Sequence, residues 1–96
     1  MGKFLRDSDV RTVTSASAQF STTMGLGIEY EIIGTTDLWY RADSSNPTAA
    51  ANTDHNHFLP RGVSARIAGN GFKVAVIRDS ADGYAELAQL VPVISS

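Results

Sequence analysis

Two histidines are the residues whose type and spacing most readily suggest chemistry. They form a His-x-His pair in the stretch Asp54-His55-Asn56-His57. On a strand such a pair points both imidazoles to one side, and imidazole is a ligand for zinc, iron or nickel. Two ligands do not complete a metal site, although a trimer would gather six around its axis. We therefore expect polar loop residues here, and keep metal binding by His55 and His57 as the weaker hypothesis.

The other polar residues form no recognisable catalytic set. Glu29 and Glu31 alternate along one expected strand, about 7 Å apart, and nothing indicates the cleft in which paired carboxylates cleave glycosides. The chain contains no Gly-x-Ser-x-Gly nucleophile motif and no glycine-rich phosphate loop. It has no cysteine, which excludes disulfides and thiol chemistry. We therefore expect a protein without enzymatic activity and without a cofactor.

The length and the net charge of the chain argue against some classes of binding partner. The chain has 96 residues, enough for one domain, and a formal net charge of −2. This charge argues against a nucleic-acid-binding protein, which would carry a basic face. No apolar stretch approaches the roughly 20 residues that cross a bilayer, and residues 1–6 are too polar for a secretory signal. The absence of cysteine favours assembly in a reducing cytoplasm.

The hydrophobic pattern predicts the fold class. Short alternating apolar runs extend from Val10 to Val93, and Gly, Pro, Asn, Asp and Ser interrupt them roughly every eight to twelve residues. No stretch keeps a helical period. We therefore expect an all-β domain at residues 10–96, an antiparallel β-sandwich of about eight strands. Its topology should be jelly-roll-like, with a simpler Greek-key sandwich as the alternative.

The chain ahead of this domain is expected to be an N-terminal arm, residues 1–9. Phe4 and Leu5 are its large apolar residues, flanked by charged side chains. If the arm is ordered, these two residues are candidate anchors on a neighbouring subunit; a frayed end is the alternative.

Individual strands are expected at 10–14, 18–22, 26–33, 38–42, 63–68, 72–78 and 84–91. Alternation places Leu26 and Val63 on the inward faces of their strands, as the first members of two apolar series. We expect 26–33 and 38–42 to form a hairpin, and Gly69-Asn70-Gly71 to make a tight hairpin turn between the strands on either side. Residues 43–56 are polar and rich in turn formers, so a long surface loop is expected there.

The best candidate interface lies on the strand at 38–42. Trp39 and Arg41 share the face opposite Leu38 and Tyr40, and Trp and Arg are enriched among interface hot spots. Arg61, in an expected turn, joins them, because arginine is favoured in protein–protein contacts. The alternative for Trp39 is a place in a second, partly covered half of the core.

Five stretches carry a family resemblance: residues 34–41, 46–49, 58–62, 73–78 and 81–83 (GTTDLWYR, NPTA, FLPRG, KVAVIR and ADG). In this layout the chain resembles small virion proteins of tailed bacteriophages. The resemblance implies a β-sandwich capsid decoration or cement protein that binds the major capsid protein or other virion proteins. It implies a homodimer or homotrimer in a virion assembled in the host cytoplasm, with no nucleic-acid or membrane partner. The alternative is a tail, collar or fibre-associated subunit that binds a receptor or carbohydrate.

Overall fold

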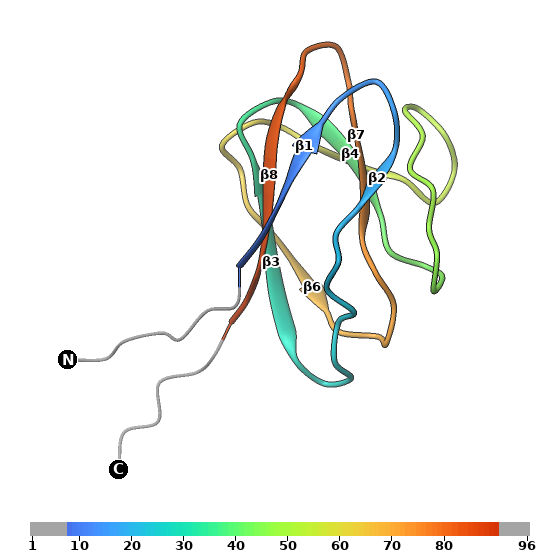
Figure 1. Cartoon of the computed structure of the whole chain (residues 1–96), viewed down its shortest axis with the longest axis vertical. Coiled ribbons are helices and arrows are strands. Elements are labelled where there is room, and N and C mark those ends of the chain that lie inside the picture. Colours follow the sequence, from blue (N-terminus) through green and yellow to red (C-terminus); the bar gives the residue numbers. More distant parts are fainter. Residues whose placement is uncertain (1–7, 91–96) are drawn as a thin grey trace, which may run out of the picture.

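The computed structural model describes residues 8–90, which form eight strands in two four-stranded antiparallel sheets. The strands are β1 (Ser8–Val13), β2 (Ala18–Gln19), β3 (Glu29–Gly34), β4 (Leu38–Arg41), β5 (His57–Leu59), β6 (Ala65–Ala68), β7 (Ala75–Arg78) and β8 (Gly83–Gln89). Sheet A has the order β1-β8-β3-β6 and sheet B the order β2-β7-β4-β5 (Figure 1). The expected antiparallel β-sandwich is confirmed.

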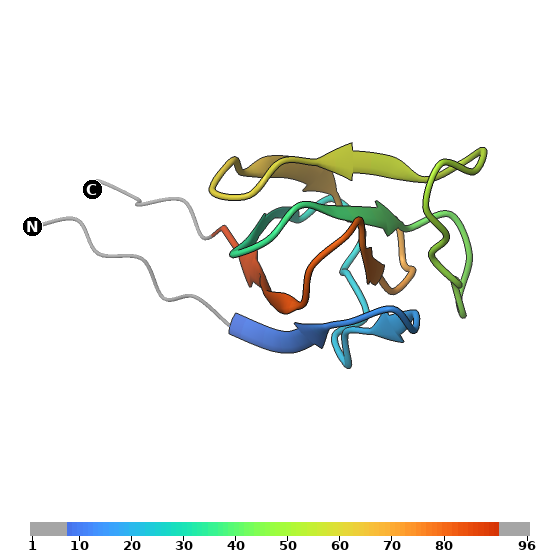
Figure 2. The ribbon, with the colours of Figure 1, turned by 90° about the horizontal axis from the view of Figure 1, so that it is seen from above.

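The strand pairing is that of a jelly roll. β1 pairs with β8, β2 with β7, β3 with β6 and β4 with β5. The first strand thus pairs with the last, the second with the second to last, and so on inward. This nesting is what a long hairpin produces when it is rolled into two layers. In Figure 2 the blue strands β1 and β2 lie along one side of the sandwich, and β5 and β6, yellow to gold, along the opposite side.

The core lies between the two sheets and takes one face of each. Val13, Ile32 and Leu87 contribute to it from sheet A, and Leu38 and Val76 from sheet B, all of them buried. Full burial of one such side chain contributes about 1.5–3 kcal/mol. Because side chains alternate along a strand, this shared core also fixes which residues face outward.

Both expected hairpins are wrong, because each turn crosses from one sheet to the other. β3 lies in sheet A and β4 in sheet B, and the link between them is held by Thr36, whose hydroxyl donates to the carbonyl of Ala81 at 2.8 Å. β6 and β7 are likewise in different sheets. There Gly69 N–H donates to the carbonyl of Ile28 at 2.7 Å, and Asn70 Nδ2 to that of Ala42 at 2.7 Å. A turn signal predicts a reversal but does not identify the strand that the chain pairs with next.

Several expected strand ends also differ. Leu26 and Val63 were expected to face inward, yet they are 78% and 49% exposed. Leu26 precedes Gly27, which has a φ of 77° and keeps this segment in a turn, so β3 begins only at Glu29. Val63 closes another turn, in which its N–H donates to the carbonyl of Pro60. β1 begins at Ser8, so the last two residues of the expected arm belong to the strand, and β5 is a strand that the sequence pattern did not indicate.

A carboxylate connects the two sheets at the β1 edge. Asp9 Oδ2 accepts hydrogen bonds from Ser21 Oγ at 2.8 Å, Thr22 N at 2.9 Å and Thr22 Oγ1 at 3.0 Å. Nearby, Arg11 Nε donates to the carbonyl of Gln19 at 2.8 Å. Burial alone would raise the pKa of Asp9, but these hydrogen bonds and the charge of Arg11 lower it on balance below its ordinary value of 3.8.

This network predicts a pH-dependent contribution to stability. A carboxyl whose pKa is lowered by folding stabilises the protein above its unfolded pKa, and the contribution is lost as the pH falls through the folded pKa. At pH 7, Asp9→Asn should lower the free energy of unfolding by about 1 kcal/mol, since hydrogen bonds to a charged acceptor are lost at a partly exposed site. Urea unfolding at a series of pH values should show this difference shrinking below pH of about 4.

Asp54→Asn is the matched control, because Asp54 is exposed and its side chain makes no hydrogen bond to another residue in 8–90. We expect its stability to equal that of the wild type. A difference between Asp9→Asn and wild type that stays constant down to low pH would contradict the role assigned to the carboxylate.

Candidate protein-binding surfaces

The outer face of sheet B carries a row of large apolar side chains that crosses three strands. Trp39 on β4 lies opposite Phe58 on β5 and, on its other side, opposite Ile77 on β7. We call these three residues the aromatic row. The Trp39 and Phe58 ring centroids are 5.2 Å apart with the planes tilted by 59°, a favourable aromatic geometry. Phe58 is 45% exposed, so the row offers apolar surface to a partner.

Polar contacts hold the row in place. Trp39 Nε1 donates to Asp79 Oδ1 at 3.0 Å, which fixes the indole ring. Arg41, on the same face of β4, donates from Nε to Asp43 Oδ1 at 2.6 Å, and this hydrogen bond lowers the pKa of Asp43. A surface pair of this kind adds little to stability. It does orient the guanidinium beside the row, which reduces the conformational entropy that binding would cost.

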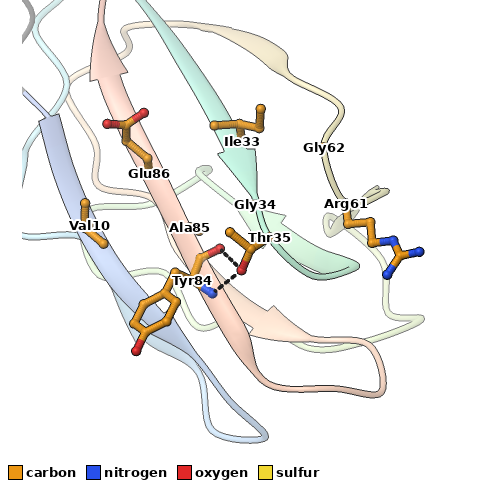
Figure 3. Close-up of a pocket in the computed structure, with 9 residues that line it drawn as sticks. All are labelled: Val10, Ile33, Gly34, Thr35, Arg61, Gly62, Tyr84, Ala85 and Glu86. Carbon is orange, nitrogen blue, oxygen red and sulfur yellow. Dashed lines mark hydrogen bonds between the residues drawn. The ribbon is translucent and has the colours of Figure 1, made fainter.

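The outer face of sheet A has a shallow apolar hollow of about 620 Å³, which we call the sheet A hollow. Its base is a cross-strand row, Val10 on β1, Glu86 on β8 and Ile33 on β3, which stand side by side in Figure 3. Tyr84 also lines it, and Val10 and Tyr84 are 54% and 58% exposed. Exposed apolar side chains gathered in one depression mark a surface suited to protein contact.

One wall of this hollow is the turn after β5. Gly62 N–H donates to the carbonyl of Gly34 at 2.9 Å, and Arg61 N–H donates to Asp37 Oδ1 at 2.8 Å (Figure 3 shows the turn). Gly62 has a φ of 74°, which glycine adopts without strain. Arg61 therefore lines the sheet A hollow, whereas Trp39 and Arg41 lie on the outer face of sheet B.

The two histidines lie at a second, smaller hollow of about 300 Å³ between edge strands β5 and β6, which we call the polar hollow. His55 Nδ1 is 3.9 Å from Asp43 Oδ2, and the His57 ring lies against Tyr40 with centroids 5.2 Å apart. Within residues 8–90, no group of three or more His, Cys, Asp or Glu side chains is placed to hold a metal ion. The metal hypothesis for His55 and His57 thus gains no third ligand in this part of the chain.

The remaining predicted anchors, Phe4 and Leu5, lie outside the described residues. Trp39 and Arg41 are on the outer face of β4, as the alternation predicts, so Trp39 is not between the sheets; their role in an interface stays a prediction. In the stretch from Ser8 to Leu90 no helix is long and apolar enough to span a membrane.

Sequence reasoning missed Phe58 and the hollow around Tyr84. No local pattern indicates that Phe58 faces outward, because β5 has only three residues and does not alternate visibly: His57 and Phe58 are both exposed, and Leu59 is buried. The sheet A hollow depends on residues from three strands and a distant turn, and no local pattern joins them.

Comparison with known proteins gives no relative: no protein-family model, no curated protein and no solved structure matches the chain.

The assignment of Trp39 to the outer face predicts an unequal response to truncation at adjacent positions. Leu38→Ala should lower the free energy of unfolding by about 3 kcal/mol, because it empties a buried core site. Trp39→Ala should cost only about 1 kcal/mol, through lost contact with Phe58 and Asp79. Urea denaturation of both variants measures this, and equal losses would put Trp39 in the core instead.

Proposed function

We propose that this chain is a structural subunit of a bacteriophage particle, a capsid decoration or cement protein that stabilises the assembled head through protein–protein contacts. The observation that carries the proposal is the aromatic row, which exposes apolar surface across three strands of a well-packed sandwich. Its composition, an indole beside a phenyl ring with an arginine on the same face, is that of an interface hot spot. The resemblance of five sequence stretches to phage virion proteins is the reason for proposing that this particle is a phage.

Two apolar surfaces on opposite sheets suit a subunit that makes two different contacts. The aromatic row covers the outside of sheet B, and the sheet A hollow opens on the outside of sheet A. One surface can bind a shell protein while the other binds a second copy, giving a homodimer or homotrimer on the shell. Many such contacts of modest affinity hold an assembled shell firmly, because each copy binds the assembly and not its separate parts.

A second candidate function is a tail, collar or fibre-associated subunit. The observation that favours it is the structure of the 43–56 loop, which is ordered by internal hydrogen bonds and by two buried residues. Ala50 N–H donates to Asn56 Oδ1 at 2.9 Å, and Asn56 Nδ2 donates to the carbonyls of Thr53 and Asp54. Pro47 and Ala49 within it are buried. A loop ordered in this way can present a recognition surface.

Particle composition tests the proposal directly. Phage particles are purified, heads are separated from tails, and each fraction is analysed by quantitative mass spectrometry. We expect the chain in the head fraction at a fixed ratio to the major capsid protein. Its absence from intact particles would refute a virion role, and its presence with the tails alone would favour the second candidate function.

Variants of the aromatic row test which surface holds the shell. Trp39→Ala and Phe58→Ala should each weaken binding to heads that lack the chain by roughly 30-fold, the effect of losing a hot spot of about 2 kcal/mol. Binding is measured by co-sedimentation, and thermal unfolding checks that each variant is folded. Leu26→Ala is the matched control, because Leu26 is also a large exposed side chain but lies outside the row. Equal binding by all three variants would show that the row is not the contact.

A further inference from the structure

The polar hollow has the volume of a small-ligand site and a mixed polar and apolar lining. At about 300 Å³ it lies at the lower end of the range of roughly 300–1,000 Å³ seen for ligand pockets. Ala42, Ile67 and the ring of Tyr40 give it an apolar part. Its polar part comes from the two histidines and other side chains of distant segments, namely Asp43, Arg66 and Asn70.

The formal charges around this hollow already have partners. Asp43 Oδ1 is 2.6 Å from Arg41 Nε, and Arg66 Nη1 is 3.8 Å from Glu29 Oε1. Asn70 is also satisfied, since its Nδ2 donates to the carbonyl of Ala42 and its Oδ1 accepts from the N–H of Phe72. Each charged side chain of the lining thus lies beside an opposite charge, which reduces its attraction for a strongly charged ligand.

A phenol and an imidazole of the lining are free to pair with a ligand. Neither the Tyr40 hydroxyl nor a ring nitrogen of His57 makes a hydrogen bond to any residue from 8 to 90. Partial burial raises the pKa of Tyr40, so its hydroxyl stays protonated and can both donate and accept. A neutral imidazole likewise offers one donor and one acceptor. This mixture of donors and acceptors beside apolar surface matches a ligand rich in hydroxyl groups.

The loop that carries His55 contains two residues in an uncommon backbone conformation. Asn52 and His55 have φ values of 53° and 69°, in the left-handed region that non-glycine residues seldom adopt. Asn56 N–H donates to the carbonyl of Thr53, which closes the turn that places His55 at the hollow. Residues kept in such backbone conformations are concentrated at functional sites.

We propose that the polar hollow binds one neutral sugar ring, such as a terminal hexose of a glycan. The hydroxyl groups of the sugar pair with Tyr40 Oη and the His57 imidazole, and its C–H groups lie on the apolar part of the lining. Aromatic faces carry partial negative charge and attract such C–H groups. This site is independent of the particle-binding proposal, since it uses neither the aromatic row nor the sheet A hollow.

The test is a titration of the full chain, labelled with ¹⁵N, with the methyl glycosides of glucose, galactose, mannose and N-acetylglucosamine. At least one glycoside should shift amide signals of residues 42–43, 55–57 and 66–70, with a dissociation constant of about 1–10 mM, the affinity of a few net hydrogen bonds. Inorganic phosphate at the same concentration should leave these signals in place. No shift with any glycoside, shifts spread over the outer faces, or a response to phosphate alone would each overturn the proposal.

Two tyrosine variants separate a binding role from a structural one. Tyr40→Phe keeps the ring and removes the hydroxyl, and should weaken glycoside binding about fivefold, the effect of losing one hydrogen bond. Tyr84→Phe is the matched control, because Tyr84 is exposed on sheet A away from this hollow, and it should bind as the wild type does. Equal affinity in the two variants would remove Tyr40 from the site, and with it the proposed geometry.

Discussion

The constraint on which the rest of this molecule depends is the single core that two sheets share. Every strand must turn one face towards that core, and the nested pairing of β1 with β8 through β4 with β5 allows few ways of doing so. A slip of one residue in β4 would bring Trp39 inward and expose Leu38. The residues that must be buried on the inner faces thus determine which residues lie on the outer faces. The candidate binding surfaces are determined in the same way.

The sequence predicted those parts of the fold that local alternation decides. Tyr30 and Ile32 on β3, and Val74 and Val76 before and within β7, are buried as their spacing indicates. The sequence pattern did not predict the features that depend on pairing with a distant strand. Residues 34–37 and 69–71 reverse the chain as expected, but both reversals lead into the opposite sheet. Turn residues encode the bend, whereas the next pairing depends on which strand edges remain open, and that is a property of the whole fold.

The same distinction between local alternation and distant pairing applies to the residues of the candidate sites. Trp39 and Arg41 could be placed on one outward face from their spacing alone, because both lie on one strand. Phe58 could not, since β5 has three residues and ends beside Pro60, and its position depends on register with β4. Arg61 was grouped with Trp39 by residue type, yet it lines the hollow of the other sheet. Residue type suggests what a side chain can do, but only pairing decides what stands beside it.

The position of the polar hollow follows from the architecture too. In a domain this small, large apolar side chains fill the space between the sheets, and their burial supplies most of the folding free energy. A recess with polar groups inside that core would cost stability that such a domain cannot spare. β5 and β6 are edge strands of different sheets, and at this edge a loop can add His55 without disturbing the core. Ligand binding at this edge and protein binding on the outer faces can therefore coexist on one small sandwich, because they use different surfaces of it.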